Sequence, residues 1–415
     1  MFKKGLLISV GTGIGDSPES ILNAIKLSIS DRNPNFVAFL VSKDSKDNAK
    51  VVVEELKLSS RNYKFFEIPD PNDLNECVKK TEEALRWLFK KGLDSSQIIA
   101  DFTSGTKPMS SAIVMVAFQK DIGRLSYIQG KREKGIVKSG TEKVVSFQPF
   151  IINSYFKFEL AYKSLLQYQF KIAHSLIGDI QNFINLLSDY KSEVKYLNFI
   201  IRGYHEWDLF HHHKAAKFFE EAKKELKGVQ EEKLKKLFPK EISHIKFIGN
   251  LIYKKEKHPA IIADLLANTD RRIEEGKYDD AIARLYRIVE LIAQVLLFCK
   301  YNLDSSNVNF EQIKEKIIRK DLLPEWKKIL EQENKIGLWK CYKLLNDLGD
   351  PIGKEIKNFQ DLLYQRNNSI LAHGLTPIKK EIVEELREKV ENICKSQFEN
   401  FEDLYRKSVF PWQRI

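Results

Sequence analysis

The sequence predicts an α/β domain at the N-terminus, followed by a long all-helical region. Short apolar runs alternate with amphipathic stretches over the first 150 residues of the 415-residue chain. After Pro149 the pattern changes, and from 155 to 410 apolar residues recur almost only at helical spacing, as in residues 279–298. A chain of this length is expected to form two or three domains. The predicted domains are residues 1–150, a helical linker over 151–258 and an all-helical domain over 259–415.

Each element of the first domain follows from this alternation. The apolar runs are predicted strands, at residues 6–13, 36–42, 63–68, 97–105 and 124–130. The amphipathic stretches are predicted helices, at residues 18–30, 45–58, 72–91 and 109–120. Apolar strands separated by helices indicate a parallel sheet with helices on both faces. Residues 142–147 are expected to add a late edge strand.

Composition and charge exclude several classes of protein. No apolar run approaches the roughly 18 residues that span a bilayer, and the apolar stretch near the N-terminus is too short for a signal peptide. The four cysteines are scattered and form no CxxC pair, so neither a zinc site nor a disulfide framework is expected. We therefore expect a cytoplasmic protein without membrane contact or metal. The diffuse net charge of +11 suits an anionic partner such as nucleic acid.

Two predicted strands end in loops rich in glycine and hydroxyl groups. Such loops let the backbone approach a ligand, and their hydroxyls can bond phosphate or ribose oxygens. A lysine at the start of the following helix adds positive charge where the helix dipole already favours anions. Together the loops predict an adenosine-phosphate site. The first loop contains Ser9, Gly11, Thr12 and Gly13, and the second contains Thr103, Ser104, Gly105, Thr106 and Lys107.

Simpler interpretations of these loops remain open. Strand-to-helix turns need glycine and hydroxyl caps without any ligand. A dinucleotide site is less well supported, because the glycines follow a GxGxG spacing and no acidic residue stands clearly at the end of the second strand. The second loop lacks the spacer of a Walker loop.

The helical region carries a second candidate site in the stretch RNNSILAHG. Arg366 and His373 lie seven positions apart, which places them on one face if a helix runs through both. Gly374 is expected to end that helix directly after His373. Asn367 adds a polar group beside the arginine. Supporting roles are expected for Arg287 and Glu290 in the apolar stretch 279–298, where Glu290 is expected to pair with an arginine.

This combination of side chains is typical of metal-independent RNA cleavage. A histidine with a near-neutral pKa can take the proton of a 2′-hydroxyl or protonate the leaving oxygen. A permanently charged arginine can hold the phosphate and stabilise the transition state. One chain supplies one such histidine, so two copies around a two-fold axis would supply both acid and base. The alternative is that Arg366 and His373 have no catalytic role and are either solvated or paired with neighbouring side chains.

These motifs, in this order, resemble the accessory ribonucleases of type III CRISPR systems. SVGTG and DFTSGTK are similar to the loops of Rossmann-like CARF domains. Arg366, Asn367 and His373 are similar to the motif of HEPN ribonucleases, which allows four to six residues between Arg and His; here there are six. The resemblance covers nearly the whole chain, although the helical segment 155–255 is larger than a plain connector.

The resemblance implies an activator, a substrate and an assembly. CARF domains of this kind bind cyclic oligoadenylates between two protomers, which implies a homodimer with tetra- or hexa-adenylate as activator. The implied contacts are the loop residues given above. Binding is transmitted allosterically to the HEPN pair, which cuts single-stranded RNA in antiviral defence. Slow cleavage of the activator, with Thr12 or Thr106 taking part, stays open.

Two rival functions remain at this stage. The first is a CARF sensor without nuclease activity that acts through a partner protein or DNA. It would need a helix-turn-helix or winged element, and the sequence carries neither signature, so stable DNA binding is not expected. The second rival is a nucleotide-dependent small-molecule enzyme.

Overall fold

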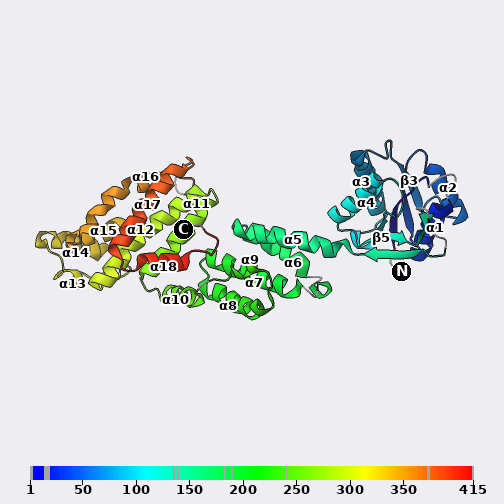
Figure 1. Ribbon diagram of the computed structural model, residues 1–415. Helices are drawn as coiled ribbons and strands as arrows, with labels where there is room; N and C mark the ends of the chain where they lie inside the picture. Colours follow the sequence, from blue (N-terminus) through cyan, green and yellow to red (C-terminus); the bar gives the residue numbers. More distant parts are fainter. Residues whose placement is uncertain are drawn as a thin grey trace. The chain divides into compact units, whose positions relative to one another are not determined.

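The structure of the protein is a computed structural model that divides into two compact units, Met1–Lys157 and Phe158–Ile415. It describes residues 3–13, 19–133, 136–137, 140–181, 184–187, 190–239, 241–371 and 374–413 (Figure 1). His373 lies outside the described residues.

The first unit is built on a six-stranded sheet with the order β3-β2-β1-β4-β5-β8. Neighbouring strands are parallel except β8, which pairs antiparallel with β5 at the sheet edge. The parallel α/β fold and the late edge strand are therefore confirmed. The strands are β1 (Gly5–Ser9), β2 (Phe36–Val41), β3 (Tyr63–Glu67), β4 (Ile98–Asp101), β5 (Arg124–Gln129) and β8 (Lys143–Phe147). A small separate pair is formed by β6 (Arg132–Glu133) and β7 (Ile136–Val137).

Helices cover both faces of the sheet, because successive strand residues point to opposite sides. Leu7 and Ala100 belong to one core with α3 (Leu74–Lys90) and α4 (Lys107–Gln119). Ile8 and Phe39 belong to the other core with α1 (Glu19–Arg32) and α2 (Lys46–Glu55). Figure 1 shows these two helix layers on either side of the strands. Every buried strand thus packs on two sides, which explains its continuous apolar sequence.

The order of the central strands decides where a ligand can bind. β1 pairs in parallel with β2 on one side and with β4 on the other. Ile8 is opposite Asp101 in this register, so the two strands end at the same edge. The loops that follow β1 and β4 therefore start side by side, at the place where open parallel sheets bind ligands.

All described regular elements after β8 are helices, as expected from the sequence. None of the described helices is long and apolar enough to cross a membrane. The largest core is centred on α12 (Tyr278–Tyr301), whose side chains Ile288, Ile292 and Leu296 are buried. The remaining α-helices are α5 (Pro149–Leu166), α6 (Phe170–Gln181), α7 (Lys191–Asp208), α8 (His212–Glu225), α9 (Glu232–Lys235), α10 (Ile242–Tyr253), α11 (Pro259–Glu274), α13 (Phe310–Ile313), α14 (Leu323–Gln332), α15 (Leu338–Asp347), α16 (Gln360–Asn368), α17 (Lys380–Gln397) and α18 (Phe401–Ser408). Short 3₁₀ segments are η1 (Ser95–Gln97), η2 (Ile184–Leu186), η4 (Leu226–Gly228), η5 (Lys320–Leu322) and η6 (Pro351–Phe359). The division of this region into a linker and a separate domain stays a prediction.

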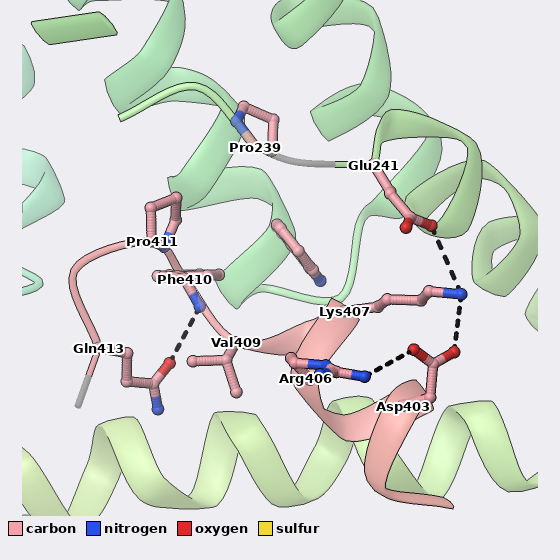
Figure 2. A pocket seen from close by; sticks show the side chains of 10 residues that line it. Pro239, Glu241, Asp403, Arg406, Lys407, Val409, Phe410, Pro411 and Gln413 are labelled. Carbon is pink, nitrogen blue, oxygen red and sulfur yellow. Dashed lines mark hydrogen bonds and ion pairs between the residues drawn. The ribbon is translucent and has the colours of Figure 1, made fainter. Parts of the chain in front are cut away.

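Residues 409–413, which we call the C-terminal strap, pack against helices from distant parts of the sequence. The ring centroids of Phe410 and of Tyr204 on α7 lie 4.6 Å apart. The guanidinium of Arg271 on α11 lies 3.9 Å from the Phe410 ring centroid. The Gln413 amide donates to the carbonyl of Ala267 on α11 at 3.1 Å, and its oxygen accepts from the backbone N–H of Phe410 (Figure 2). The strap therefore ties α7 to α11.

Candidate functional site

The two loops at the ends of β1 and β4 are joined by a reciprocal pair of serines. The hydroxyl of Ser104 donates to the carbonyl of Ser9 at 2.6 Å, and the hydroxyl of Ser9 donates to the carbonyl of Ser104. The N–H of Gly11 donates to the Ser104 hydroxyl at 3.2 Å. A Cβ on Gly11 would lie 2.8 Å from the nitrogen of Gly105, so the approach of the two loops requires a glycine. Both serine side chains are buried and occupied between the loops.

The buried carboxylate of Asp101 anchors the start of the second loop. Asp101, the last residue of β4, accepts from the hydroxyls of Ser28 at 2.8 Å and Ser126 at 3.1 Å. The Arg32 guanidinium lies 3.4 Å from the same carboxylate, and burial lowers the pKa of this arginine. Asp101 also accepts from the N–H of Thr103, so the loop starts from a fixed anchor. This network was not predicted from the sequence, although an aspartate that ends a buried strand was the available signal.

The remaining loop residues differ in how open they are. Thr12 and Lys107 are exposed, and Lys107 is the first residue of α4. Thr106 caps this helix, accepting from the N–H of Met109, while its hydroxyl donates to the carbonyl of Pro71. The positive end of the α4 dipole and the charge of Lys107 therefore coincide at an accessible position.

Three more loop residues complete this edge of the sheet. Thr103 accepts from the N–H of Ile128 at 2.9 Å, and Gly13 and Gly105 have φ angles of 102° and 93°. Asn48 on α2, which the sequence analysis did not consider, donates to the carbonyls of Gly11 at 3.0 Å and Thr12 at 3.2 Å. The first loop is thus held from its outer side as well.

In the helical unit, the helix that carries Arg366 is shorter than expected. α16 ends at Asn368, and Ser369 already has an extended conformation with ψ of 159°. The expectation that one helix runs from Arg366 to Gly374 is therefore wrong. The hydroxyl and the N–H of Ser369 both donate to the carbonyl of Arg366, which competes with continuation of the helix. Arg366 stands in the last turn of α16.

Arg366 is held by two neighbouring side chains. Its guanidinium lies 4.8 Å from the centroid of the Tyr286 ring on α12, which makes a cation–π contact. Its Nη1 donates to the Oδ1 of the exposed Asn367 at 3.1 Å. Tyr286 was missed by the sequence analysis, because it was taken as part of the apolar helix face. The expected pairing of Glu290 with an arginine is confirmed, since Arg287 donates to it.

The segment after α16 folds back on itself. The N–H of Gly374 donates to the carbonyl of Ser369 at 3.2 Å, and the N–H of Thr376 donates to that of Asn368 at 3.3 Å. A Cβ on Gly374 would lie 2.0 Å from the Asn368 oxygen, so only glycine permits this closure. We call residues 369–378 the closed loop. It contains the position of His373.

The structure also shows a pocket next to the C-terminal strap (Figure 2). Its volume is about 300 Å³, and Lys407 on its wall lies 2.8 Å from Asp403 and 3.7 Å from Glu241. None of the predicted site residues lines it. Among the described residues, no three His, Cys, Asp or Glu side chains lie close enough together to hold a metal ion.

Comparisons with known proteins show what the chain is similar to. Residues 250–397 match the family model of the Csm6 HEPN domain, and this segment contains α12, α16 and the closed loop. The structure is similar to that of Enterococcus italicus Csm6 bound to cyclic hexa-2′-fluoro-hexa-dAMP, with a TM-score of 0.60, 12% sequence identity and 98% of each chain covered. No curated protein gives a significant match. Residues 250–397 are thus similar to a Csm6 HEPN domain, and the fold of the chain is similar to that of the Enterococcus italicus protein.

Proposed function

We propose that the protein is a homodimeric endoribonuclease that cleaves single-stranded RNA without a metal ion and is activated by a cyclic oligoadenylate. Its role is antiviral defence in a type III CRISPR system. The observation that carries this proposal is Arg366, held at the end of α16 beside the closed loop inside the segment that matches the Csm6 HEPN domain.

The chemistry assigned to this site follows from its side chains. The Tyr286 ring covers one face of the Arg366 guanidinium, and Asn367 accepts from its Nη1. The guanidinium has further N–H groups that can bond a phosphate. The guanidinium stabilises the charge that develops on the phosphate during cleavage. His373 transfers the proton of the attacking 2′-hydroxyl or protonates the leaving oxygen. These roles of Arg366 and His373 need no metal ion.

Exposed apolar side chains support the proposed dimer. In the helical unit, the closed loop presents Ile370, Leu371 and Leu375, with Leu375 87% exposed. In the sheet unit, α4 presents Met115 and α5 presents Phe156, which is 69% exposed. Such side chains gain most from burial against another protein surface. A second copy of the chain covers them and brings a second Arg366 and His373 to the site.

The activator site is assigned to the loops after β1 and β4. Thr106 and Lys107 stand at the N-terminus of α4, where a phosphate is favoured by both charge and dipole, and Thr12 follows Gly11 in the first loop. Ser9 and Ser104 join the loops, and the glycines bring the backbone close to the ligand. The similar Enterococcus italicus Csm6 was solved with cyclic hexa-2′-fluoro-hexa-dAMP, so cyclic hexa-adenylate is the first activator to test and tetra-adenylate the second. The ring activates only if it binds the active arrangement of the dimer more tightly than the inactive one.

The test is a fluorogenic single-stranded RNA assay in the presence of EDTA, with cyclic tri-, tetra- and hexa-adenylate added separately. We expect one ring to switch on cleavage. Arg366→Ala and His373→Ala are each expected to lower kcat by about 100-fold or more without changing activator binding. Arg319→Ala, which removes an exposed arginine paired with Asp321, serves as the control.

Other results would redirect the assignment. Binding of a ring without cleavage would support the alternative of a sensor that acts through a partner protein or DNA. Cleavage that survives both Arg366→Ala and His373→Ala would show that the nuclease site lies elsewhere. Slow disappearance of the ring from the wild-type reaction, but not from Thr12→Ala or Thr106→Ala, would assign cleavage of the activator to the same loops.

A further inference from the structure

One carboxylate of α12 contacts both ends of the closed loop. The Oδ1 of Asp279 accepts from the N–H of Ile370 at 3.3 Å, and its Oδ2 accepts from the N–H of Ile378 at 3.5 Å. Asp279 lies in the first turn of α12, where the helix dipole favours a negative charge. The two ends of the segment that carries His373 are therefore fastened to the same side chain.

The same helix also holds the arginine. Tyr286, whose ring lies beneath the Arg366 guanidinium, follows Asp279 by seven residues, so the two side chains lie on one face of α12, two turns apart. α12 is the central helix of the largest core and its inner side chains are buried. The helix α12 therefore fixes the spacing between the contact of Asp279 with the closed loop and the contact of Tyr286 with Arg366.

We propose that Asp279 and Tyr286 are positioning residues that set the distance between Arg366 and the two ends of the closed loop, at Ile370 and Ile378. This inference rests on the proposed ribonuclease function. Neither residue needs to touch RNA. Misplacement of a reacting group by about 1 Å can cost about 100-fold in rate, so loosening either contact is expected to lower kcat.

The chain offers matched variants for a test. Asp279→Asn keeps the size of the side chain but removes its charge. The control is Asp280→Asn on the same turn, because Asp280 pairs with Arg284 at 3.3 Å and does not bond to any described residue of the closed loop. Tyr286→Phe keeps the ring under Arg366, whereas Tyr286→Leu removes it. Each full-length variant is assayed for RNA cleavage at saturating activator and for amide hydrogen exchange in the peptides that contain Ile370 and Ile378.

The expected pattern separates positioning from general stability. Asp279→Asn and Tyr286→Leu lower kcat by about 10-fold with KM within about twofold, while Asp280→Asn and Tyr286→Phe stay close to wild type. Amide exchange near Ile370 and Ile378 becomes faster in Asp279→Asn only. If Asp279→Asn fails to fold, the Tyr286 pair carries the same test.

Three results would overturn the inference. Wild-type kcat in Asp279→Asn and Tyr286→Leu, combined with an inactive Arg366→Ala, would leave the proposed function standing and remove the positioning roles. An equal loss in Asp280→Asn would show a general effect on the helix. Full cleavage by Arg366→Ala would remove the proposed nuclease site and this inference with it.

Discussion

Replacement of Ser104 by alanine tests whether the serine pair joins the two loops or contacts the ligand. The change removes the hydroxyl that donates to Ser9 at 2.6 Å and accepts from Gly11 at 3.2 Å. A hydrogen bond contributes about 0.5–1.5 kcal/mol, and both groups left behind are buried, so we expect a loss of about 2 kcal/mol. Because 1.4 kcal/mol is about a factor of 10, local opening should increase about 30-fold.

Amide hydrogen exchange read peptide by peptide measures this loss directly in the full-length protein. The peptides that cover β1 and β4 should exchange about 30-fold faster in Ser104→Ala, and cyclic oligoadenylate should bind more weakly because the loops separate. Ser111→Ala on the exposed side of α4 is the control, with an expected change within about 0.5 kcal/mol. Unchanged exchange in Ser104→Ala, together with lost binding, would refute the reasoning and make Ser104 a direct ligand contact.

Three further predictions concern the helical unit. Phe410→Ala should destabilise it by about 4 kcal/mol in urea unfolding, because its ring is only 1% exposed, whereas Tyr253→Ala, at 82% exposure, should change little; equal losses would contradict this. Gly374→Ala should lower RNA cleavage but not activator binding, because its Cβ would meet the Asn368 oxygen; unchanged cleavage would show that the loop tolerates opening. Burial lowers the pKa of His244 below its ordinary 6.5, so the unfolded chain takes up the proton first and stability falls as pH decreases below about 6.5. The drop in melting temperature from about pH 8 to about pH 5.5 should therefore be smaller in His244→Gln than in wild type. An equal drop in both proteins would assign the pH effect to other groups.

Much of the fold could be predicted because the hydrophobic pattern reports burial directly. The apolar runs of β1, β2 and β4 are continuous since both of their faces are covered. The strand order could not be read from this pattern, because any central strand has the same composition. Only the observed pairing of β1 with β4 brings the two loops together.

The candidate site was harder to predict because hydrogen bonds between distant residues decide it. Ser9 and Ser104 were predicted to bind the ligand, and in the structure their hydroxyls also join the two loops across 95 residues of sequence. The helix through Arg366 was expected to continue to Gly374, but the Ser369 hydroxyl competes for the Arg366 carbonyl and ends it early. The spacing of residues in the sequence predicts neither the serine pair nor the early end of α16.

The C-terminal strap makes the folding of this unit depend on the order of synthesis. Residues 409–413 supply Phe410 and Gln413 to the space between α7 and α11. The ribosome produces Ala267 of α11 146 residues before Gln413, and it produces α7 earlier still. Until these residues leave the ribosome, Tyr204 and the buried Arg271 lack a face of their packing. The N-terminal unit can fold as it emerges, whereas the helical unit is completed only after residues 409–413 have emerged.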